Sequence, residues 1–375
     1  MNRPTAVEMF CGVGGMTLGF RQAGFRILAA VDNDPINVKL HRKNFSKCAT
    51  ICADVRNLSG PAFQRLTKLQ RRRVDVLIGG PPCQGFSLIG KRRVDDERNQ
   101  LVLAFVRWVR SLKPRYFVME NVPGFLSGNG HHILNSFLAR ARRAGYGVVT
   151  PIRILNAADF GVPQRRRRAF VLGYRLDMPA PSYPEASPLR DADGNLYCPT
   201  VWDAISDLPD VDTLEDALST DRFTGEVQRP SYYAQLLRGE INDPNDKSRL
   251  RSCNGHGLGG CLRTNHTAAT VLRFQATAQG TYESGSRCFR LEARDISPTL
   301  RAGTGPAQGS FTAARPIHPT FPRCITVREA ARLHSFPDWF EFHATKWHGF
   351  RQIGNSVPPF LARAVAKAVH DVLTP

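Results

Sequence analysis

The stretch "EMFCGVGGMTLGF" at residues 8–20 joins the end of an apolar run to a glycine-rich turn and the start of a helical pattern. Glycine lets the backbone approach a ligand closely and adopt positive φ angles. Gly12, Gly14 and Gly15 lack the G-x-G-x-x-G spacing of dinucleotide-binding loops, and the P-loop pattern is absent from the chain. The stretch therefore predicts a strand, a turn and a helix that suit a nucleoside ligand without phosphates.

The same alternation of strand and helix patterns continues to residue 174. Strands are expected at 5–10, 26–32, 74–80, 115–121, 147–155 and 168–174, and helices near 16–23, 35–44, 61–70, 99–112 and 131–144. Such alternation with short loops predicts an α/β fold with a doubly wound, mainly parallel sheet. Ligands of these sheets bind at the carboxyl ends of the strands. The glycine turn, Asp32, Cys83 and Glu120 all fall there, which favours an enzyme.

Two acidic residues strengthen the prediction of a nucleoside site. Asp32 stands 20 residues beyond Gly12 at the end of the second strand, where a carboxylate can accept hydrogen bonds from ribose hydroxyls. Asp54 ends the next apolar stretch, where it could accept a hydrogen bond from an adenine amino group. The alternative for each acid is a helix N-cap.

A single cysteine lies in the stretch "GGPPCQGFS" at residues 79–87, directly after the apolar run "VDVLI". Two prolines stiffen the backbone before Cys83. A buried structural cysteine needs no such setting, whereas a nucleophile does, because geometry sets how often attack succeeds. A thiol hydrolase would need a histidine partner, and none of the strand-end segments contains one. A non-catalytic DNA-binding module would leave this turn and Glu120 unexplained.

The bulk composition points to a polyanionic partner. The 375 residues carry a formal net charge of +19, with a pI of about 10.1, which favours nucleic acid. The chain has no apolar run of roughly 18 residues and no signal-peptide core, so we expect no membrane association and a cytoplasmic location. Nine cysteines without a CxxC pair, and scattered histidines, predict reduced thiols and no metal site.

The composition changes after about residue 175. Residues 177–246 contain 15 acidic and 4 basic residues, whereas residues 247–315 contain 3 acidic and 10 basic residues. Periodicity is poor in both halves, and a regular pattern returns after residue 322. We therefore predict a first domain over 1–175, a smaller loop-rich domain over 176–321 whose basic half faces a phosphate backbone, and a segment over 322–375 that returns to the first domain.

Six motifs in order make the chain resemble the cytosine-5 DNA methyltransferase family. They are "FCGVGG", "PPCQGFS", "MENVPG", "FGVPQRRRR", "TVREAARLHSFPD" and "QIGNSVPP". The resemblance covers residues 5–174 and 322–370, and the middle part lies where that family keeps its variable target recognition domain. It implies the S-adenosylmethionine-dependent methyltransferase fold and methylation of cytosine in double-stranded DNA. It also implies a monomer of the bacterial cytoplasm or nucleoid, in a restriction-modification context with a cognate endonuclease acting separately.

The resemblance also assigns roles to residues. Cys83 would be the nucleophile, Glu120 would hold or protonate the cytosine ring nitrogen, and Arg168, with Arg166 beside it, would contact the cytosine carbonyl. Glu8 stands where the family usually has aspartate, and Asp32 where it usually has glutamate. The cofactor pocket would comprise Phe10, Gly12, Gly15, Asp32, Asp54, Val55, Pro82, Leu101, Asn355 and Ser356, and DNA contacts would come from Ser87, Thr299 and Leu300.

These residue types suit the chemistry. A thiolate can add to carbon 6 of cytosine and so activate carbon 5 toward the methyl group. An acid and an arginine can stabilise the charge that develops on the ring. Amino-group methyltransferases place an aromatic residue where Cys83 stands. The nearest alternative is an RNA cytosine-5 methyltransferase such as a transfer RNA enzyme, against which the 150-residue middle part argues.

Overall fold

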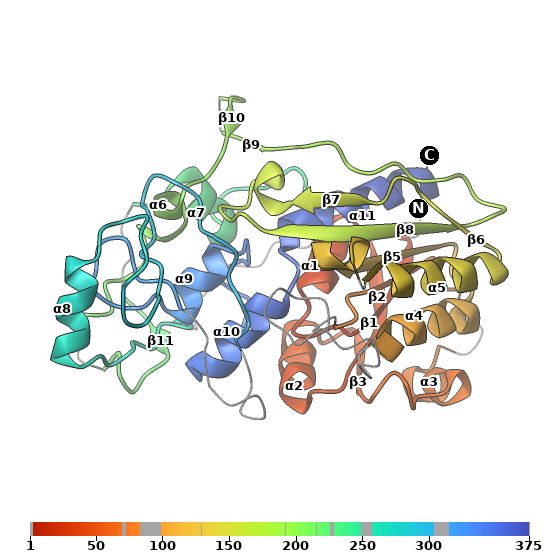
Figure 1. Cartoon of the computed structure of the whole chain (residues 1–375), viewed down its shortest axis with the longest axis horizontal. Coiled ribbons are helices and arrows are strands. Elements are labelled where there is room, and N and C mark those ends of the chain that lie inside the picture. Colours follow the sequence, from red (N-terminus) through yellow and green to blue (C-terminus); the bar gives the residue numbers. More distant parts are fainter. Residues whose placement is uncertain are drawn as a thin grey trace.

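One mixed sheet forms the centre of the molecule (Figure 1). The computed structural model describes residues 3–69, 73–82, 99–128, 130–191, 193–214, 216–225, 229–248, 257–303 and 315–374. In this part of the chain eight strands pair in the order β3-β2-β1-β4-β5-β8-β6, with β7 also paired to β8. Their bounds are β1 (Thr5–Met9), β2 (Arg26–Asp32), β3 (Ala49–Cys52), β4 (Val76–Gly79), β5 (Tyr116–Asn121), β6 (Tyr146–Val148), β7 (Arg153–Asn156) and β8 (Arg167–Arg175).

The strand directions confirm the doubly wound, mainly parallel sheet. Strands β1 to β5 run parallel to one another, and β8 is antiparallel to β5, β6 and β7. The strand order changes direction between β1 and β4, and in open α/β sheets ligands bind at such a switch point.

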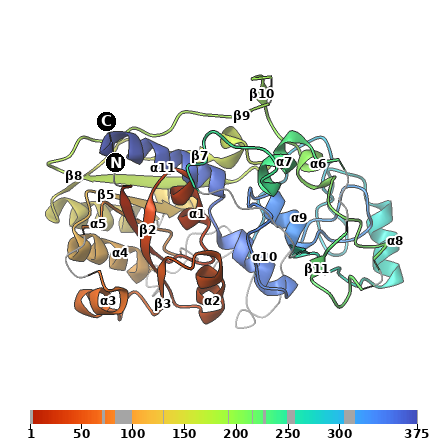
Figure 2. The same ribbon diagram turned by 180° about the vertical axis from the view of Figure 1, so that it is seen from behind.

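Helices cover both faces of the sheet (Figures 1 and 2). On one face Phe63, Phe105 and Phe137 of α3, α4 and α5 pack in one cluster with residues of the strands. On the other face α1 and α11 pack together so closely that a Cβ added at Gly19 would lie 2.5 Å from the Cβ of Ala362. The helices of these layers are α1 (Gly15–Gln22), α2 (Pro35–Asn44), α3 (Gly60–Thr67), α4 (Asn99–Leu112), α5 (Gly130–Arg143) and α11 (Pro359–Leu373).

Short polar caps explain where several helices begin. The Asp34 side chain accepts a hydrogen bond from the Ile36 amide at 2.9 Å, and Pro35 occupies the first turn of α2. Thr326 and Glu329 form a capping box at the start of α9 (Val327–Arg332). These side chains pair amide groups that the helix itself leaves unpaired.

One strand expectation was wrong in detail, and one strand was not predicted. The expected strand at 147–155 is two strands, β6 and β7, which pair with opposite halves of β8. Pro151 lies between them, and it has no N–H to donate to the sheet. Strand β3 was not predicted, because its four residues are too few to show a period.

The second part of the chain lies beyond the carboxyl edge of the sheet, with short elements joined by long loops (Figures 1 and 2). One buried cluster includes Ala6 of β1, Val201 of α6 and Tyr233 of α7, so the core is continuous between the two parts. The boundaries at 176 and 321 stay predictions. The remaining elements are η1 (Pro123–Leu126), η2 (Ala157–Phe160), β9 (Leu189–Arg190), β10 (Leu196–Tyr197), α6 (Val201–Ile205), β11 (Arg222–Phe223), α7 (Tyr232–Arg238), β12 (Leu258–Gly259), α8 (Ala268–Ala276) and α10 (Lys346–Asn355).

The C-terminal segment divides between the two parts. Helix α9 packs against α6 and α10, and Arg332 forms buried ion pairs with Asp207 at 3.0 Å and Asp338 at 2.6 Å. Helix α11 instead packs on α1. None of the helices in the described residues is long and apolar enough to cross a membrane.

Candidate active site

The carboxyl ends of the parallel strands lie together at the edge of the sheet that faces the second part of the chain (Figure 1). The register pairs Met9 with Gly79, and Gly79 with Met119. Because the strands end at one level, the side chains at or just beyond their ends are neighbours. These residues are Phe10, Asp32, Gly80 and Glu120.

Strand β8 brings an arginine to the same edge. It is antiparallel to β5 with Asn121 opposite Ala169, so Arg168 lies next to Glu120. The Arg168 Nε lies 2.9 Å from Glu120 Oε1, and both side chains are almost buried. A Cβ at Gly80 would lie 2.9 Å from Glu120 Oε2, so a larger residue there would press on the carboxylate.

Burial and charge act on Glu120 in opposite directions. Burial raises the pKa of Glu120, while Arg168 and Arg166 lower it by a smaller amount. The pKa therefore stays above the ordinary value of a glutamate, which makes the carboxyl better able to hold a proton at neutral pH. This is the property that an acid beside a ring nitrogen needs.

Arg166 has different surroundings from Arg168. Its Nη1 donates to the Leu300 carbonyl at 3.0 Å, and its Nη2 donates to the carbonyls of Gly354 at 2.7 Å and Ser356 at 2.9 Å. The residue is 1 % exposed. Its guanidinium is thus directed at main-chain oxygens of two distant segments, although alternation along an extended chain predicts the same side for Arg166 and Arg168.

The neighbouring Gln164 is a residue to which the sequence analysis gave no role. Its Nε2 donates to the Leu333 carbonyl at 3.1 Å and lies 3.0 Å from His334 Nδ1, while its Oε1 accepts from the Leu300 amide at 3.2 Å. It is fully buried. A glutamine directly before a run of arginines was the available signal, but nothing in the sequence indicated its partners.

The glycine turn and Asp32 form one hydrogen-bonded unit. Asp32 Oδ2 accepts from the Gly12 amide at 2.8 Å, and Oδ1 accepts from the Asp34 amide at 2.9 Å and from the Asn37 side chain at 3.3 Å. Burial raises the pKa of Asp32, and these bonds oppose the rise. A carboxylate can accept about four hydrogen bonds, so capacity for a ligand hydroxyl remains.

The glycines of the turn differ in what surrounds them. Gly12 has φ +54° and a Cβ there would meet nothing within 4 Å, which leaves open space beside the loop. A Cβ at Gly15 would lie 2.4 Å from the Val357 carbonyl oxygen. Gly15 thus allows α1 to approach the start of α11. Phe10, at φ +60°, packs partly into the core beside the turn.

Asp54 and Val55, the predicted pocket residues after β3, both accept hydrogen bonds from arginine side chains. Asp54 accepts from the Arg56 amide at 2.8 Å and from its guanidinium at 2.7 Å, and the Arg56 hydrogen bonds lower the pKa of Asp54. Val55 is buried, and its carbonyl accepts from Trp108 at 3.0 Å and from Arg107. Of the other predicted pocket residues, Leu101 packs against the core of this layer and Pro82 is exposed.

The last motif places two predicted residues at the end of α10. Asn355 is exposed, whereas Ser356 is almost buried and donates from its Oγ to the Gln352 carbonyl at 2.7 Å. The Ser356 carbonyl lies 3.0 Å from His334 Nε2 in addition to its bond with Arg166. Only Asn355 of this pair therefore presents its side chain to solvent.

Thr299 and Leu300 are predicted to contact DNA. In the structure Thr299 contacts Arg165, and Leu300 contacts Arg166. Thr299 Oγ1 donates to the Arg165 carbonyl at 2.5 Å, and the Arg165 side chain forms an ion pair with Asp295 at 2.7 Å. Leu300 is 3 % exposed, so its side chain packs in the core. The Arg165 side chain is exposed, and its ion pair with Asp295 joins the two parts of the chain.

Two predicted residues, Cys83 and Ser87, lie outside the described residues. The described range that precedes them ends at Pro82, and the next one begins at residue 99. The Asn121 side chain donates to the Pro81 carbonyl at 3.4 Å, so the turn that leads to Cys83 starts beside the residue that follows Glu120.

A buried polar chain behind the glycine turn was also missed. Thr17 donates to Glu8 and lies 3.1 Å from His41 Nε2, and His41 Nδ1 lies 2.8 Å from Thr50 Oγ1. Burial raises the pKa of Glu8 to about 8 and lowers that of His41 to about 3. These residues come from four separate elements, so no sequence spacing links them.

Comparisons with known proteins agree with this geometry. The model of the family "C-5 cytosine-specific DNA methylase" matches residues 5–371. The chain is 50 % identical over 373 residues to the type II methyltransferase M.XorII of Xanthomonas oryzae, covering 100 % of this chain and 86 % of that protein. It is 33 % identical to the type II methyltransferase M.AgeI of Thalassovita gelatinovora, covering 97 % of this chain and 98 % of the relative.

Solved structures give the same result. A prophage-encoded E. coli protein described as a DNA modification methyltransferase superposes with a TM-score of 0.80 at 33 % identity, over 99 % of this chain and 100 % of that one. An Entamoeba histolytica methyltransferase, at 16 % identity and a TM-score of 0.58 over the whole of both chains, shares the fold. The fold is that of S-adenosylmethionine-dependent methyltransferases. The chain belongs to the C-5 cytosine-specific DNA methylase family and is a DNA (cytosine-5) methyltransferase.

Proposed function

We propose that Cys83 is the nucleophile of this methyltransferase and that Glu120 and Arg168 act together on the target cytosine. The observation that carries the proposal is the buried Glu120–Arg168 pair, beside which the Pro81–Pro82 turn leads to Cys83. Glu120 supplies a proton donor, and Arg168 supplies a cation that is held in direct contact with it. A cytosine ring presents a basic ring nitrogen next to a carbonyl, and the pair matches these two groups.

The proposed roles follow from the chemistry of the ring. The Cys83 thiolate adds to carbon 6, and the electron pair of the C5–C6 double bond moves to carbon 5. Glu120 holds a proton at ring nitrogen 3, and Arg168 stabilises negative charge on the carbonyl oxygen. After methylation, loss of the carbon-5 proton re-forms the double bond and releases the cysteine. The target base must leave the duplex to reach these groups.

We propose that the glycine turn and Asp32 hold S-adenosylmethionine. Open space beside Gly12, remaining acceptor capacity on Asp32 and the exposed Asn355 suit a nucleoside. When bound, this cofactor supplies an electrophilic methyl group on its sulfonium. Gly15, Val55 and Ser356 would shape the pocket through the backbone, because their side-chain positions are buried or closely packed. Asp54 would orient the cofactor together with Arg56.

We propose that residues 176–321 read the DNA sequence. This part joins the catalytic edge through the Arg165–Asp295 ion pair and the Arg166–Leu300 bond. This part consists largely of irregular loops, and loops on a rigid scaffold commonly carry the residues that bind a partner. The buried Leu300 side chain makes Thr299 the better candidate for a DNA contact. Because several relatives are named type II methyltransferases, we propose a restriction-modification context, with a separately acting endonuclease and a cytoplasmic monomer.

The test is covalent trapping. DNA in which 5-fluorocytosine replaces the target cytosine cannot lose a carbon-5 proton, so the cysteine adduct should persist and migrate with the DNA in a denaturing gel. The wild-type enzyme should form the adduct and Cys83→Ala should not, while Cys52→Ala, a change at an exposed cysteine, should behave as wild type. An adduct with Cys83→Ala would overturn the nucleophile assignment. Bisulfite sequencing of DNA from a host expressing the enzyme would give the recognition site.

A further inference from the structure

The amino edge of the sheet, opposite the catalytic edge, carries a row of cations. A basic residue stands at the first position of β2 and within three residues before β1, β3, β4 and β5. We define the amino-edge rim as the exposed cations of this row together with Lys68 at the end of α3. The rim comprises Arg3, Arg26, Lys47, Lys68, Arg73 and Lys113.

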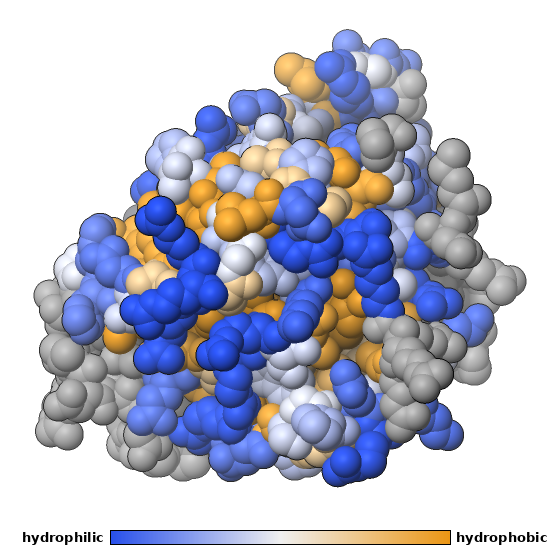
Figure 3. Space-filling model, turned by 90° about the vertical axis from the view of Figure 1, so that its right-hand side faces the viewer, coloured by the Kyte–Doolittle hydropathy of each residue, from blue (hydrophilic) through white to orange (hydrophobic). Residues whose placement is uncertain are grey.

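In the described part of the chain none of the rim cations forms an ion pair, whereas Arg115, directly before β5, pairs with Asp75 at 3.5 Å. Arg73 has a nearby carboxylate, since its charge helps to lower the pKa of Asp177. Figure 3 views the molecule from this end and shows hydrophilic residues around smaller hydrophobic areas. Unpaired like charges repel one another, so a polyanion that replaces their counterions should bind here.

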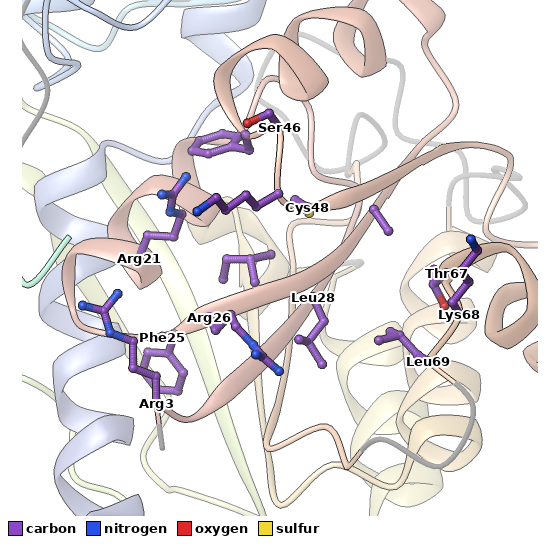
Figure 4. Close-up of a pocket in the computed structure, with 14 residues that line it drawn as sticks. Arg3, Arg21, Phe25, Arg26, Leu28, Ser46, Cys48, Thr67, Lys68 and Leu69 are labelled. Atoms are coloured by element: carbon purple, nitrogen blue, oxygen red, sulfur yellow. The ribbon is translucent and has the colours of Figure 1, made fainter. Parts of the chain in front are cut away.

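The rim also borders a hollow of about 830 Å³ (Figure 4). Its floor is apolar, with Phe25, Leu28 and Leu69 almost buried. Arg3 and Arg26 stand on one side and Lys68 on the other, and none of the described residues that line the hollow is acidic. The cations lie exposed around its margin, although Arg3 also donates to the Lys247 carbonyl at 3.1 Å. This arrangement suits the extended phosphates of a nucleic acid better than one small enclosed anion.

DNA held at the catalytic edge cannot cover the rim at the same time. The seven residues of β2 separate the two edges by about 23 Å. A duplex resists bending over short lengths, since its persistence length is about 150 base pairs. A straight duplex in the site therefore leaves the rim free. We propose that the amino-edge rim binds a second segment of double-stranded DNA through its phosphates, without reading sequence.

Such a surface has a clear use in a DNA-modifying enzyme. It would hold a distant part of the same DNA molecule, or another molecule, while the catalytic edge is occupied. The second segment would then be at high local concentration when the first is released. Transfer between segments would shorten the search for target sites on long DNA and would matter little on a short duplex.

The experiment is a two-duplex capture assay. Enzyme is bound to an immobilised short duplex that contains one methylation site, and retention of a labelled duplex without a site is measured over a range of salt concentrations. Wild type should retain the second duplex at low salt. The variant Arg26→Gln/Lys47→Gln/Lys68→Gln should retain at least tenfold less, and the log–log salt slope should be shallower by about 2 to 3.

The control is Lys39→Gln/Arg140→Gln/Arg142→Gln, which removes three exposed cations elsewhere. It should retain the second duplex as wild type does, and both triple variants should methylate the short duplex at the wild-type rate. Equal retention by the rim variant and wild type would overturn the proposal. So would an equal loss of affinity for the immobilised duplex, which would place the rim on the path of the first DNA. Competition by inorganic phosphate at millimolar concentration but not by duplex would indicate a small-anion site instead.

Discussion

The Arg166 guanidinium and the Leu300 carbonyl oxygen lie 3.0 Å apart in the interior, 134 residues apart in the sequence. The same guanidinium also binds the carbonyls of Gly354 and Ser356. One side chain at the entrance of β8 thereby fixes the second part of the chain and the α10–α11 junction to the catalytic edge. Arg168, two residues later, contacts Glu120 instead. Two arginines of one short run thus have separable roles.

We expect Arg166→Met to lower the free energy of unfolding by roughly 3 kcal/mol or more, because the buried carbonyls of Leu300 and Gly354 lose this donor. The Ser356 carbonyl keeps His334 as a partner. Arg168→Met should cost less, since Glu120 can take up a proton when its partner is removed, but it should slow methyl transfer at least 100-fold. Urea unfolding and single-turnover transfer of a labelled methyl group measure the two effects. If Arg166→Met kept the wild-type stability but lost most of its catalytic rate, the separate structural and catalytic roles of Arg166 and Arg168 would be contradicted.

Glu120→Gln should slow methyl transfer by 100-fold to 10,000-fold, the range for a lost general acid. Burial raises the pKa of Glu120, so the wild-type rate should fall as pH rises above that pKa, where the proton is lost. The glutamine side chain does not titrate, so the fall in rate at high pH, the falling limb, should be absent from the pH profile of Glu120→Gln. Glu185→Gln, at an exposed carboxylate, provides the control. An unchanged falling limb in Glu120→Gln would assign that limb to another group.

The pKa of Glu8 is about 8 in the folded protein, against 4.5 for an ordinary glutamate. Between these values the folded state keeps a proton that the unfolded state has lost. Stability from this group is therefore full below pH 4.5 and is lost as pH rises toward 8, at no more than about 1.4 kcal/mol per pH unit. Glu8→Gln should flatten the dependence of unfolding free energy on pH over this range, whereas the exposed Glu292→Gln should not. Parallel curves for Glu8→Gln and wild type would refute the assignment.

Two glycines of one loop should respond differently to alanine. Gly15→Ala places a Cβ 2.4 Å from the Val357 carbonyl oxygen and should destabilise the fold by about 1–3 kcal/mol. Gly12→Ala meets no atom within 4 Å, and its left-handed backbone should cost about 1–2 kcal/mol. We expect Gly12→Ala, in contrast, to weaken binding of S-adenosylhomocysteine by calorimetry more than Gly15→Ala does. The reverse order would mean that Gly12 is not in the cofactor pocket.

The sheet and its helices could be predicted because the sequence repeats one local pattern. Helix α4 and helix α2 each begin and end at the expected residues, and Pro35 marks the first turn of α2. The location of the site at one edge of the sheet followed from the rule that parallel strands end together, and Glu120 and Asp32 lie at that edge. Helix α10 was not predicted, because glycine and mixed polar residues obscure its period.

The partners of individual side chains could not be predicted, because they depend on distant segments. The sequence gives no reason for Gln164 to contact His334, or for Glu8 to lie at one end of a chain that reaches Thr50. Arg165 and Arg166 are similar in sequence context, yet one is exposed beside Asp295 and the other is buried on carbonyl oxygens. Only the three-dimensional arrangement distinguishes the exposed arginine from the buried one.

The packing of α1 on α11 has a consequence for the newly synthesised protein. The two helices are separated by more than 330 residues, and a ribosome adds about 5–20 residues per second. The face of α1 that includes Gly19, which packs on Ala362 of α11, therefore waits for roughly 20–70 seconds before its partner emerges. During that interval an unfinished chain carries an uncovered apolar helix, and premature termination anywhere before α11 leaves it uncovered permanently. Truncated products should therefore be recognised by chaperones and proteases even when most of the sheet has formed.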